Sequence, residues 1–182
     1  MKKIIIAAIA MVAIAIAPKT NAQTKMVGGA AMYPTKNIVE NAVNSKDHTT
    51  LVAAVKAAGL VETLESAGPF TVFAPTNEAF NRLPAGTVDN LVKPENKEML
   101  TKILTYHVVP GRLSSEELWA KVKAGNGKAE LTTVQGEKLT AMAKGKKLYL
   151  VDEKGGQSWI TIADVNQSNG VIHVVNTVLM PN

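Results

Sequence analysis

The order of hydrophobic patterns along the chain constrains its fold more than any other feature. Apolar residues recur at helical spacing through much of the first two thirds, whereas the last third consists of strand-like runs separated by turns. These runs cover residues 128–135, 137–143, 147–152, 158–164 and 171–179. Helices followed by strands indicate an α+β domain, because a parallel α/β sheet requires the two to alternate.

The expected helices carry recognisable start and stop signals. Ile38, Val39 and their neighbours predict one short helix, and residues 51–58 predict a second that ends at Gly59. A further helix is expected over residues 97–104. Ser114 followed by Glu117 forms a capping box for another.

A strand-to-helix corner is predicted between these helices. Residues 70–73 alternate aromatic and β-branched side chains like a strand, and Pro75 stops the pairing. Thr76 can then cap the first turn of a new helix. Residues 106–109 are expected to form another apolar strand.

The N-terminus has the pattern of a secretory signal peptide. Lys2 and Lys3 precede an apolar run over residues 4–17, which is shorter than the ~20 residues that span a bilayer core. We expect residues 1–22 to be a leader and 23–35 a flexible arm. Residues 36–182 are expected to form a single domain in the periplasm or outside the cell, with no integral membrane segment after cleavage.

Charge and cysteine content narrow the class of protein. Losing Lys2, Lys3 and Lys19 with the leader lowers the formal net charge of +5 by three, to +2. The remaining lysines are scattered among acidic residues and form no basic face, which argues against nucleic acid as a partner. The chain has no cysteine, so no disulfide stabilises it and the hydrophobic core must suffice.

Three motifs, in order, resemble those of one known family. Residues 71–80 read TVFAPTNEAF, Tyr106 and His107 follow as a pair, and residues 169–181 read NGVIHVVNTVLMP. Together they resemble the signature segments of the fasciclin domain family. That resemblance implies a wedge of two β-sheets with several short helices packed alongside, the first-signature strand joining the sheets.

The resemblance also implies a function and candidate residues. Fasciclin domains point to extracellular adhesion and recognition, and integrin binding by animal members has been attributed to the Tyr-His pair and to an Asp-Ile step. The matching candidates for partner binding are Tyr106, His107, Asp164 and Val165. Asn176 departs from the family, which most often has aspartate at that position.

No catalytic motif emerges from the sequence, and we expect neither an enzyme nor a cofactor or metal site. Of the three histidines, His107 and His173 lie in apolar segments and are expected to be buried and neutral. His48 stands among polar residues and is expected to be exposed. A hydrolase would require His107, His173 and Asp164 to meet in space.

Two functions therefore stand ahead of a hydrolase. The first is a monomeric, non-enzymatic adhesion or recognition module that binds a cell-surface or matrix protein or polysaccharide. The alternative is a carrier of a lipophilic small molecule in an apolar groove. Residues 144–147 (KGKK) predict a hairpin turn that could contact an acidic polysaccharide or a phospholipid surface. Tyr149 and Trp159 are expected to pair across neighbouring strands.

Overall fold

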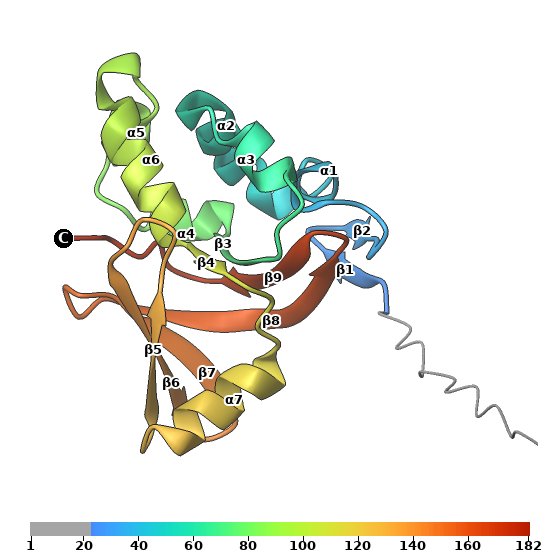
Figure 1. Ribbon diagram of the computed structural model, residues 1–182. Coiled ribbons are helices and arrows are strands. Elements are labelled where there is room, and N and C mark those ends of the chain that lie inside the picture. The colour runs from blue at the N-terminus through green and yellow to red at the C-terminus, as the bar shows by residue number, and fades with distance from the viewer. Residues whose placement is uncertain (1–22) are drawn as a thin grey trace, which may run out of the picture.

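The computed structural model describes residues 23–182, so the expected leader lies outside the described residues (Figure 1). The strands are β1 (Lys25–Val27), β2 (Ala30–Met32), β3 (Phe70–Pro75), β4 (Val108–Pro110), β5 (Lys128–Thr132), β6 (Lys138–Lys144), β7 (Lys147–Val151), β8 (Gln157–Gln167) and β9 (Gly170–Val175). The α-helices are α1 (Ile38–Ala42), α2 (Thr49–Ala58), α3 (Val61–Glu65), α4 (Asn77–Asn81), α5 (Thr87–Leu91), α6 (Lys97–Tyr106) and α7 (Ser115–Ala124), with 3-10 turns at Lys46–His48 and Pro94–Asn96.

Seven strands form a bent sheet in the order β4-β3-β9-β8-β7-β6-β5. Only β3 and β9 run parallel; the other neighbours are antiparallel. The long strand β8 pairs with β7 near its start and with β9 along the rest, so it joins two parts of the sheet that diverge in Figure 1. These two parts form the expected wedge, and the first-signature strand β3 lies within it. The α+β class is confirmed.

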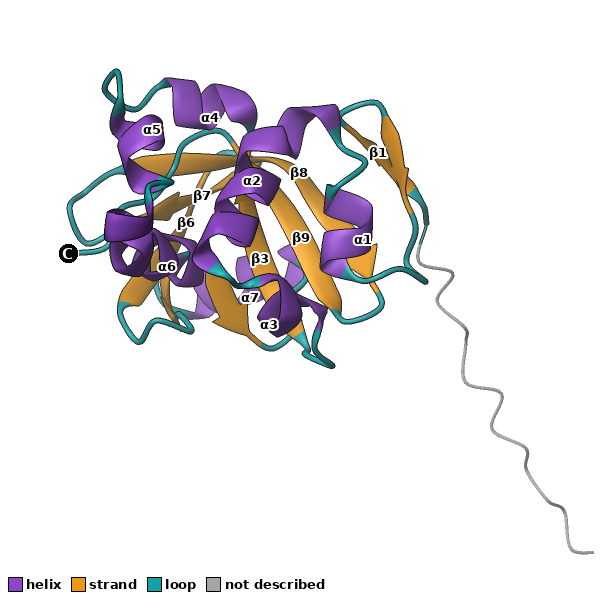
Figure 2. Ribbon diagram, turned by 90° about the horizontal axis from the view of Figure 1, so that it is seen from above, coloured by secondary structure: helices purple, strands orange, loops and turns teal. Residues whose placement is uncertain are grey.

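Each part of the sheet has its own hydrophobic core. Helices α1, α2, α3 and α6 cover the β3–β9 part, as Figure 2 shows from above. The second core lies between α7 and strands β5, β6 and β7, and includes the fully buried Leu118, Leu139 and Leu150. Burying apolar side chains in this way is the main stabilising contribution in a domain without disulfides.

The predicted helix ends are confirmed. The Thr76 hydroxyl accepts a hydrogen bond from the amide of Ala79, and Ser114 and Glu117 form a reciprocal capping box at the start of α7. Gly59 ends α2 in the left-handed region at φ +74°. Each cap provides a partner for backbone groups that the helix itself leaves unpaired.

The segment expected to be a flexible arm instead contains a β-hairpin, so that prediction is wrong for residues 25–32. Strands β1 and β2 pair through a Gly28-Gly29 turn, and Val27 and Met32 are 2% and 3% exposed. Gly28 lies so close to Ser45 that a Cβ would collide with the serine hydroxyl. The hairpin is therefore a packed part of the domain.

The turn before β9 connects distant helices to the sheet. The buried Asn169 side chain accepts from the amide of Ile38 at 3.0 Å and donates to the carbonyls of Leu64 and Ser66 at 2.7 and 2.9 Å. One side chain thus satisfies the start of α1 and the end of α3. Among residues 23–182, no helix is both long and apolar enough to cross a membrane.

Candidate functional site

The Tyr-His pair lies at the end of α6, in the interior. Tyr106 is helical rather than part of the expected strand, which begins two residues later. The reason is that α6 continues to Tyr106, so this ring packs against the second core while its hydroxyl donates to the carbonyl of Lys138 at 2.8 Å. Tyr106 therefore connects α6 to strand β6.

His107 is buried, as expected, and both ring nitrogens have partners. Nε2 accepts from the amide of Leu179 at 3.0 Å, and Nδ1 therefore carries the proton that it donates to the carbonyl of Ile103, 2.8 Å away. Burial lowers the pKa of His107 to about 4. The imidazole is thus a neutral brace between α6 and the C-terminal segment.

His173 holds a second network at the bulge in β8. Its Nδ1 accepts from the amide of Asp164 at 3.3 Å, and its Nε2 donates to the carbonyl of Leu113 at 2.8 Å. The ring also stacks on Phe73, with centroids 5.7 Å apart. Burial lowers the pKa of His173, which keeps the ring neutral as expected.

Asp164 positions helix α7. It lies in the bulge between Ile162 and Val165 at φ +55°, and its carboxylate accepts from the amide of Ser115 at 2.6 Å and contacts the Ser115 hydroxyl. Burial raises the pKa of Asp164, but these hydrogen bonds outweigh burial and leave the pKa lowered. An ionised carboxylate at a helix N-terminus also stabilises the helix dipole.

The four candidate residues therefore do not form one exposed surface in this structure. The side chains of Tyr106, His107 and Val165 are buried, and only Asp164 is half-buried. Asp164 meets His173 through its backbone amide, while His107 makes its hydrogen bonds to other groups. Within residues 23–182 no group of histidine, aspartate and glutamate side chains has the arrangement of a metal site.

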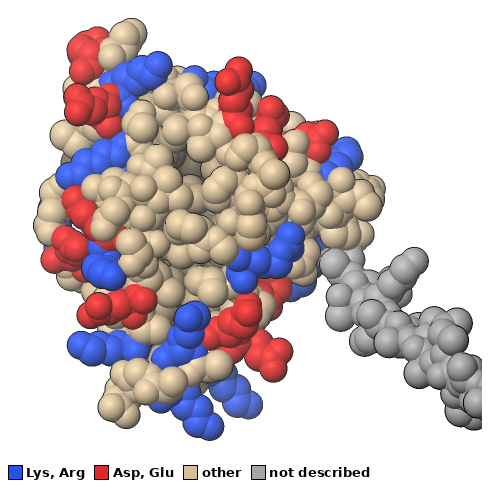
Figure 3. Space-filling model, in the orientation of Figure 1, with Lys and Arg blue, Asp and Glu red and all other residues tan. Residues whose placement is uncertain are grey.

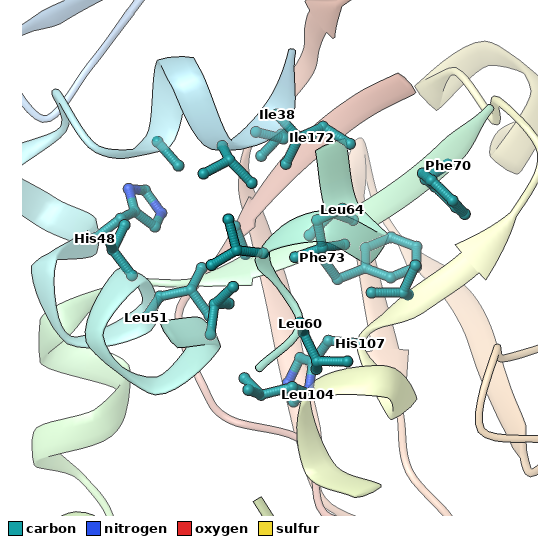
Figure 4. Close-up of a pocket in the computed structure, with 18 of the residues that line it drawn as sticks. Ile38, His48, Leu51, Leu60, Leu64, Phe70, Phe73, Leu104, His107 and Ile172 are labelled. Atoms are coloured by element: carbon teal, nitrogen blue, oxygen red, sulfur yellow. The ribbon is translucent and has the colours of Figure 1, made fainter. Parts of the chain in front are cut away.

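An apolar cavity lies between the helices and the β3–β9 part of the sheet. Its volume is about 70 Å³, and Figure 4 shows side chains from α2, α3, β3 and α6 pointing into it. Leu51, Leu64, Leu104 and Ile172 are among its walls. In Figure 3 the surface above it is hollowed and ringed by uncharged residues.

His48 lines this cavity, so the prediction that it is exposed is wrong. It is 3% exposed, and the 3-10 turn that carries it is hydrogen-bonded to the β1–β2 hairpin, where the amide of Lys46 donates to the carbonyl of Gly28 at 3.1 Å. Nδ1 lies 2.9 Å from the Ser45 hydroxyl, whereas Nε2 has no hydrogen-bond partner among the described residues. Burial lowers the pKa of His48. The nearby carbonyl of Ala74 opposes this shift, although it does not form a hydrogen bond with the ring.

A second, open hollow lies between α7 and strands β7 and β8. It has a volume of about 850 Å³, and its lining includes Trp119, Trp159, Lys146 and Lys147. The expected cross-strand pair is confirmed, because the Tyr149 and Trp159 rings stack with centroids 4.7 Å apart. Lys146 lies in the turn between β6 and β7 that was predicted at residues 144–147, and Lys147 begins β7.

Asn176, where the family most often has aspartate, completes one wall of this hollow. Its side-chain oxygen accepts from the amide of Trp159 at 2.9 Å, and its carbonyl accepts from the Arg82 guanidinium at 3.1 Å. An amide oxygen makes the hydrogen bond to Trp159 without a charge. Asn176 therefore serves to hold β8 against the segment that follows β9.

Comparisons with known proteins agree on one family. A family model described as the fasciclin domain matches residues 46–181. The chain is 48% identical to "Protein sll1483" of Synechocystis sp. over 90% of this chain and 83% of that protein. It is 34% identical to "Immunogenic protein MPB70" of Mycobacterium bovis over 96% of this chain and 92% of that protein.

Two animal matches extend the comparison. "Transforming growth factor-beta-induced protein ig-h3" of Sus scrofa is 41% identical over 72% of this chain, which spans only 17% of that protein. A solved FAS1 domain pair from the insect cell adhesion molecule Fasciclin I superposes with a TM-score of 0.70 at 15% identity, covering 80% of this chain and 51% of that one. The sequence motifs, the bent sheet with its helices and these matches together show that the chain belongs to the fasciclin domain family.

Proposed function

We propose that this protein is an exported, non-enzymatic recognition module that binds an acidic polysaccharide of the cell envelope or matrix through the hollow between α7 and β8. The observation that carries the proposal is the combination of Trp119 and Trp159 with Lys146 and Lys147 around one open concavity. Aromatic faces offer a sugar ring apolar contact area, and lysine ammonium groups attract carboxylates.

The buried family motif supports this placement of the binding surface. His173 and Asp164 connect the bulge in β8 to Ser115, and Ser115 itself lines the hollow. In this account the motif residues position α7, and the ligand contacts Trp119 one turn further along. Direct partner binding by Tyr106, His107, Asp164 and Val165 stays a prediction.

The family context supports adhesion in general terms. One solved structure with this fold comes from the insect cell adhesion molecule Fasciclin I. Two lysines followed by an isoleucine- and alanine-rich run at the N-terminus support export, and we propose cleavage before Gln23. We propose that the protein is a monomer, so avidity for a repetitive polysaccharide would come from repeated sites on the ligand.

Binding to polygalacturonate, with neutral dextran as a comparison polymer, tests the proposal. We expect Lys146→Glu with Lys147→Glu to weaken polygalacturonate binding at least tenfold, and added salt to weaken wild-type binding because exposed charges are screened. Trp119→Ala should weaken binding at unchanged charge.

The matched control is Lys93→Glu with Lys97→Glu, which makes the same charge change at exposed positions near the start of α6. Equal losses in the two charge-reversed pairs would show that net charge, and not the hollow, governs binding. Failure of wild-type protein to bind acidic polysaccharides or envelope fractions at micromolar concentration would overturn the proposal.

A second candidate function, carriage of a lipophilic small molecule, is favoured by the cavity beneath α2, α3 and α6. Its walls are almost wholly apolar, and it lies on the opposite part of the sheet from the hollow. Extraction of the protein from its native host should then recover a bound lipophile. A protein that is reproducibly free of such molecules would count against carriage.

A further inference from the structure

The cavity beneath the helices is narrow as well as apolar. Its volume of about 70 Å³ is several times what one water molecule occupies, yet below the 150 Å³ of an engineered cavity that admits benzene. Its lining extends from Met32 and His48 at one end to Leu104 and His107 at the other. A space of this volume is too small for aromatic or fused rings and accepts only a slender aliphatic chain, whose remaining carbons would lie in the surface hollow above it (Figure 3).

The two ends of the cavity differ in how their histidines are satisfied. His107 uses both ring nitrogens in hydrogen bonds to backbone groups. His48 uses only Nδ1, and its Nε2 is buried without a partner among the described residues. An unpaired buried polar group is destabilising, and this one lies at the His48 end of the cavity.

The His48 ring is held in place from behind. Ser45 contacts Nδ1 at 2.9 Å and is itself 1% exposed. Gly28 of the hairpin lies against the Ser45 hydroxyl, and only a residue without a Cβ fits there. The carbonyl of Ala74 lies near the ring but makes no hydrogen bond with it, so Nε2 has no partner among residues 23–182.

The hydrogen-bonding capacity of Nε2 determines which polar group of a ligand can lie beside His48. A hydroxyl both donates and accepts, so it pairs with Nε2 whichever nitrogen of His48 carries the proton. A carboxylate would have to lose its hydration in an apolar cavity beside an uncharged ring, which is costly. Burial keeps the pKa of His48 low, so the ring offers a carboxylate no full positive charge.

We infer that the cavity binds one unbranched aliphatic chain that ends in a neutral hydroxyl, with the hydroxyl hydrogen-bonded to Nε2 of His48. This inference rests on the second candidate function and adds to it the ligand class and the polar contact. Val27, Met32 and Ile38 complete the cavity wall from a segment that precedes the family match at residues 46–181. The N-terminal hairpin is thus part of the binding site.

The test compares 1-octanol with n-octane, two ligands of equal chain length that differ in the hydroxyl. Binding is followed by NMR shifts of cavity-lining groups in the purified protein. We expect 1-octanol to bind at least tenfold more tightly than n-octane. The Ser45→Ala, His48→Phe double variant, which removes both polar partners together, should bind the two ligands equally.

Two further variants separate the possible failures. Ala42→Leu fills the cavity from α1 and should abolish binding of both ligands, while Ala57→Leu on the exposed face of α2 should leave binding unchanged. Equal binding of octane and octanol to wild type, or octanol preference that survives in the double variant, would overturn the role of His48. Absence of binding by either ligand would overturn carriage itself.

Discussion

A buried histidine lies at each end of the apolar cavity, but the two differ in how many of their ring nitrogens are hydrogen-bonded. At the α6 end, His107 belongs to a complete network, as does His173 deeper in the sheet. At the hairpin end, His48 is equally buried but half satisfied. Complete pairing is what a structural polar group requires, whereas an unpaired atom facing a cavity marks a position where a ligand can contribute stability.

The largest expected effect on stability comes from breaking the hydrogen-bond network of His173. His173→Ala leaves the carbonyl of Leu113 and the amide of Asp164 without partners and removes a fully buried ring. We expect a loss of about 4 kcal/mol in the free energy of unfolding, from the two unpaired groups and the cavity. Urea denaturation measures it, and a loss below about 1 kcal/mol would contradict a structural role for this histidine.

Acid should next weaken the separate network of His107. The pKa of His107 is about 4 when folded and close to 6.5 when unfolded, so the unfolded chain binds more protons between these values. Stability is therefore complete above pH 6.5 and falls as the pH drops toward 4. From pH 7 to pH 5 the loss from His107 should be about 2 kcal/mol.

Denaturation curves at pH 7, 6 and 5 measure this loss above the range in which carboxylates titrate. The lowered pKa of His173 acts in the same direction and adds to it. Unfolding free energies that are equal at pH 7 and pH 5 would refute the neutral, buried state of these rings.

Substitutions at Asp164 separate two contributions to stability, the contacts with Ser115 and the backbone conformation. Asp164→Ala loses the contacts to Ser115 and places a Cβ-bearing residue without a polar side chain at φ +55°, for an expected cost of about 2 kcal/mol. Asp164→Gly loses the same contacts but tolerates this φ, so about 1 kcal/mol is expected. Thermal unfolding of the pair separates the two effects, and identical losses would mean that backbone strain plays no part.

The smallest effect is expected at the incomplete site. Ser45→Ala combined with His48→Phe removes a buried hydroxyl and a half-paired ring together, and replacing both partners by apolar groups is close to neutral. We expect a change of less than about 1 kcal/mol, measured by urea denaturation beside His173→Ala. A loss as large as that of His173→Ala would make His48 a structural residue as well.

Local signals in the sequence predicted much of the fold. Thr76, Gly59 and the Ser114–Glu117 capping box determine helix ends through neighbouring backbone groups, and the α+β order follows from patterns within single segments. The hairpin at residues 25–32 escaped prediction because three-residue strands carry little periodicity. Their burial depends on contact with Ser45 and the helices, far along the chain.

The candidate sites were less predictable for a related reason. The polar neighbours of His48 indicated exposure, and only the folded hairpin reverses that. A cavity is volume that packed elements leave unfilled, so no residue pattern specifies it. Tyr149 and Trp159 were predictable as a pair because adjacent strands bring them together, but Trp119 lines the hollow beside Trp159 only through the position of α7.

The most direct test is NMR of the histidine side-chain nitrogens in the ¹⁵N-labelled protein, with and without 1-octanol. We predict that the Nε2 resonance of His48 shifts on binding, while His107 and His173 keep their tautomers, with the proton on Nδ1 and Nε2 respectively. Unchanged His48 signals together with shifts at His107 or His173 would contradict it, because the family motif would then be the ligand site and His48 part of the scaffold.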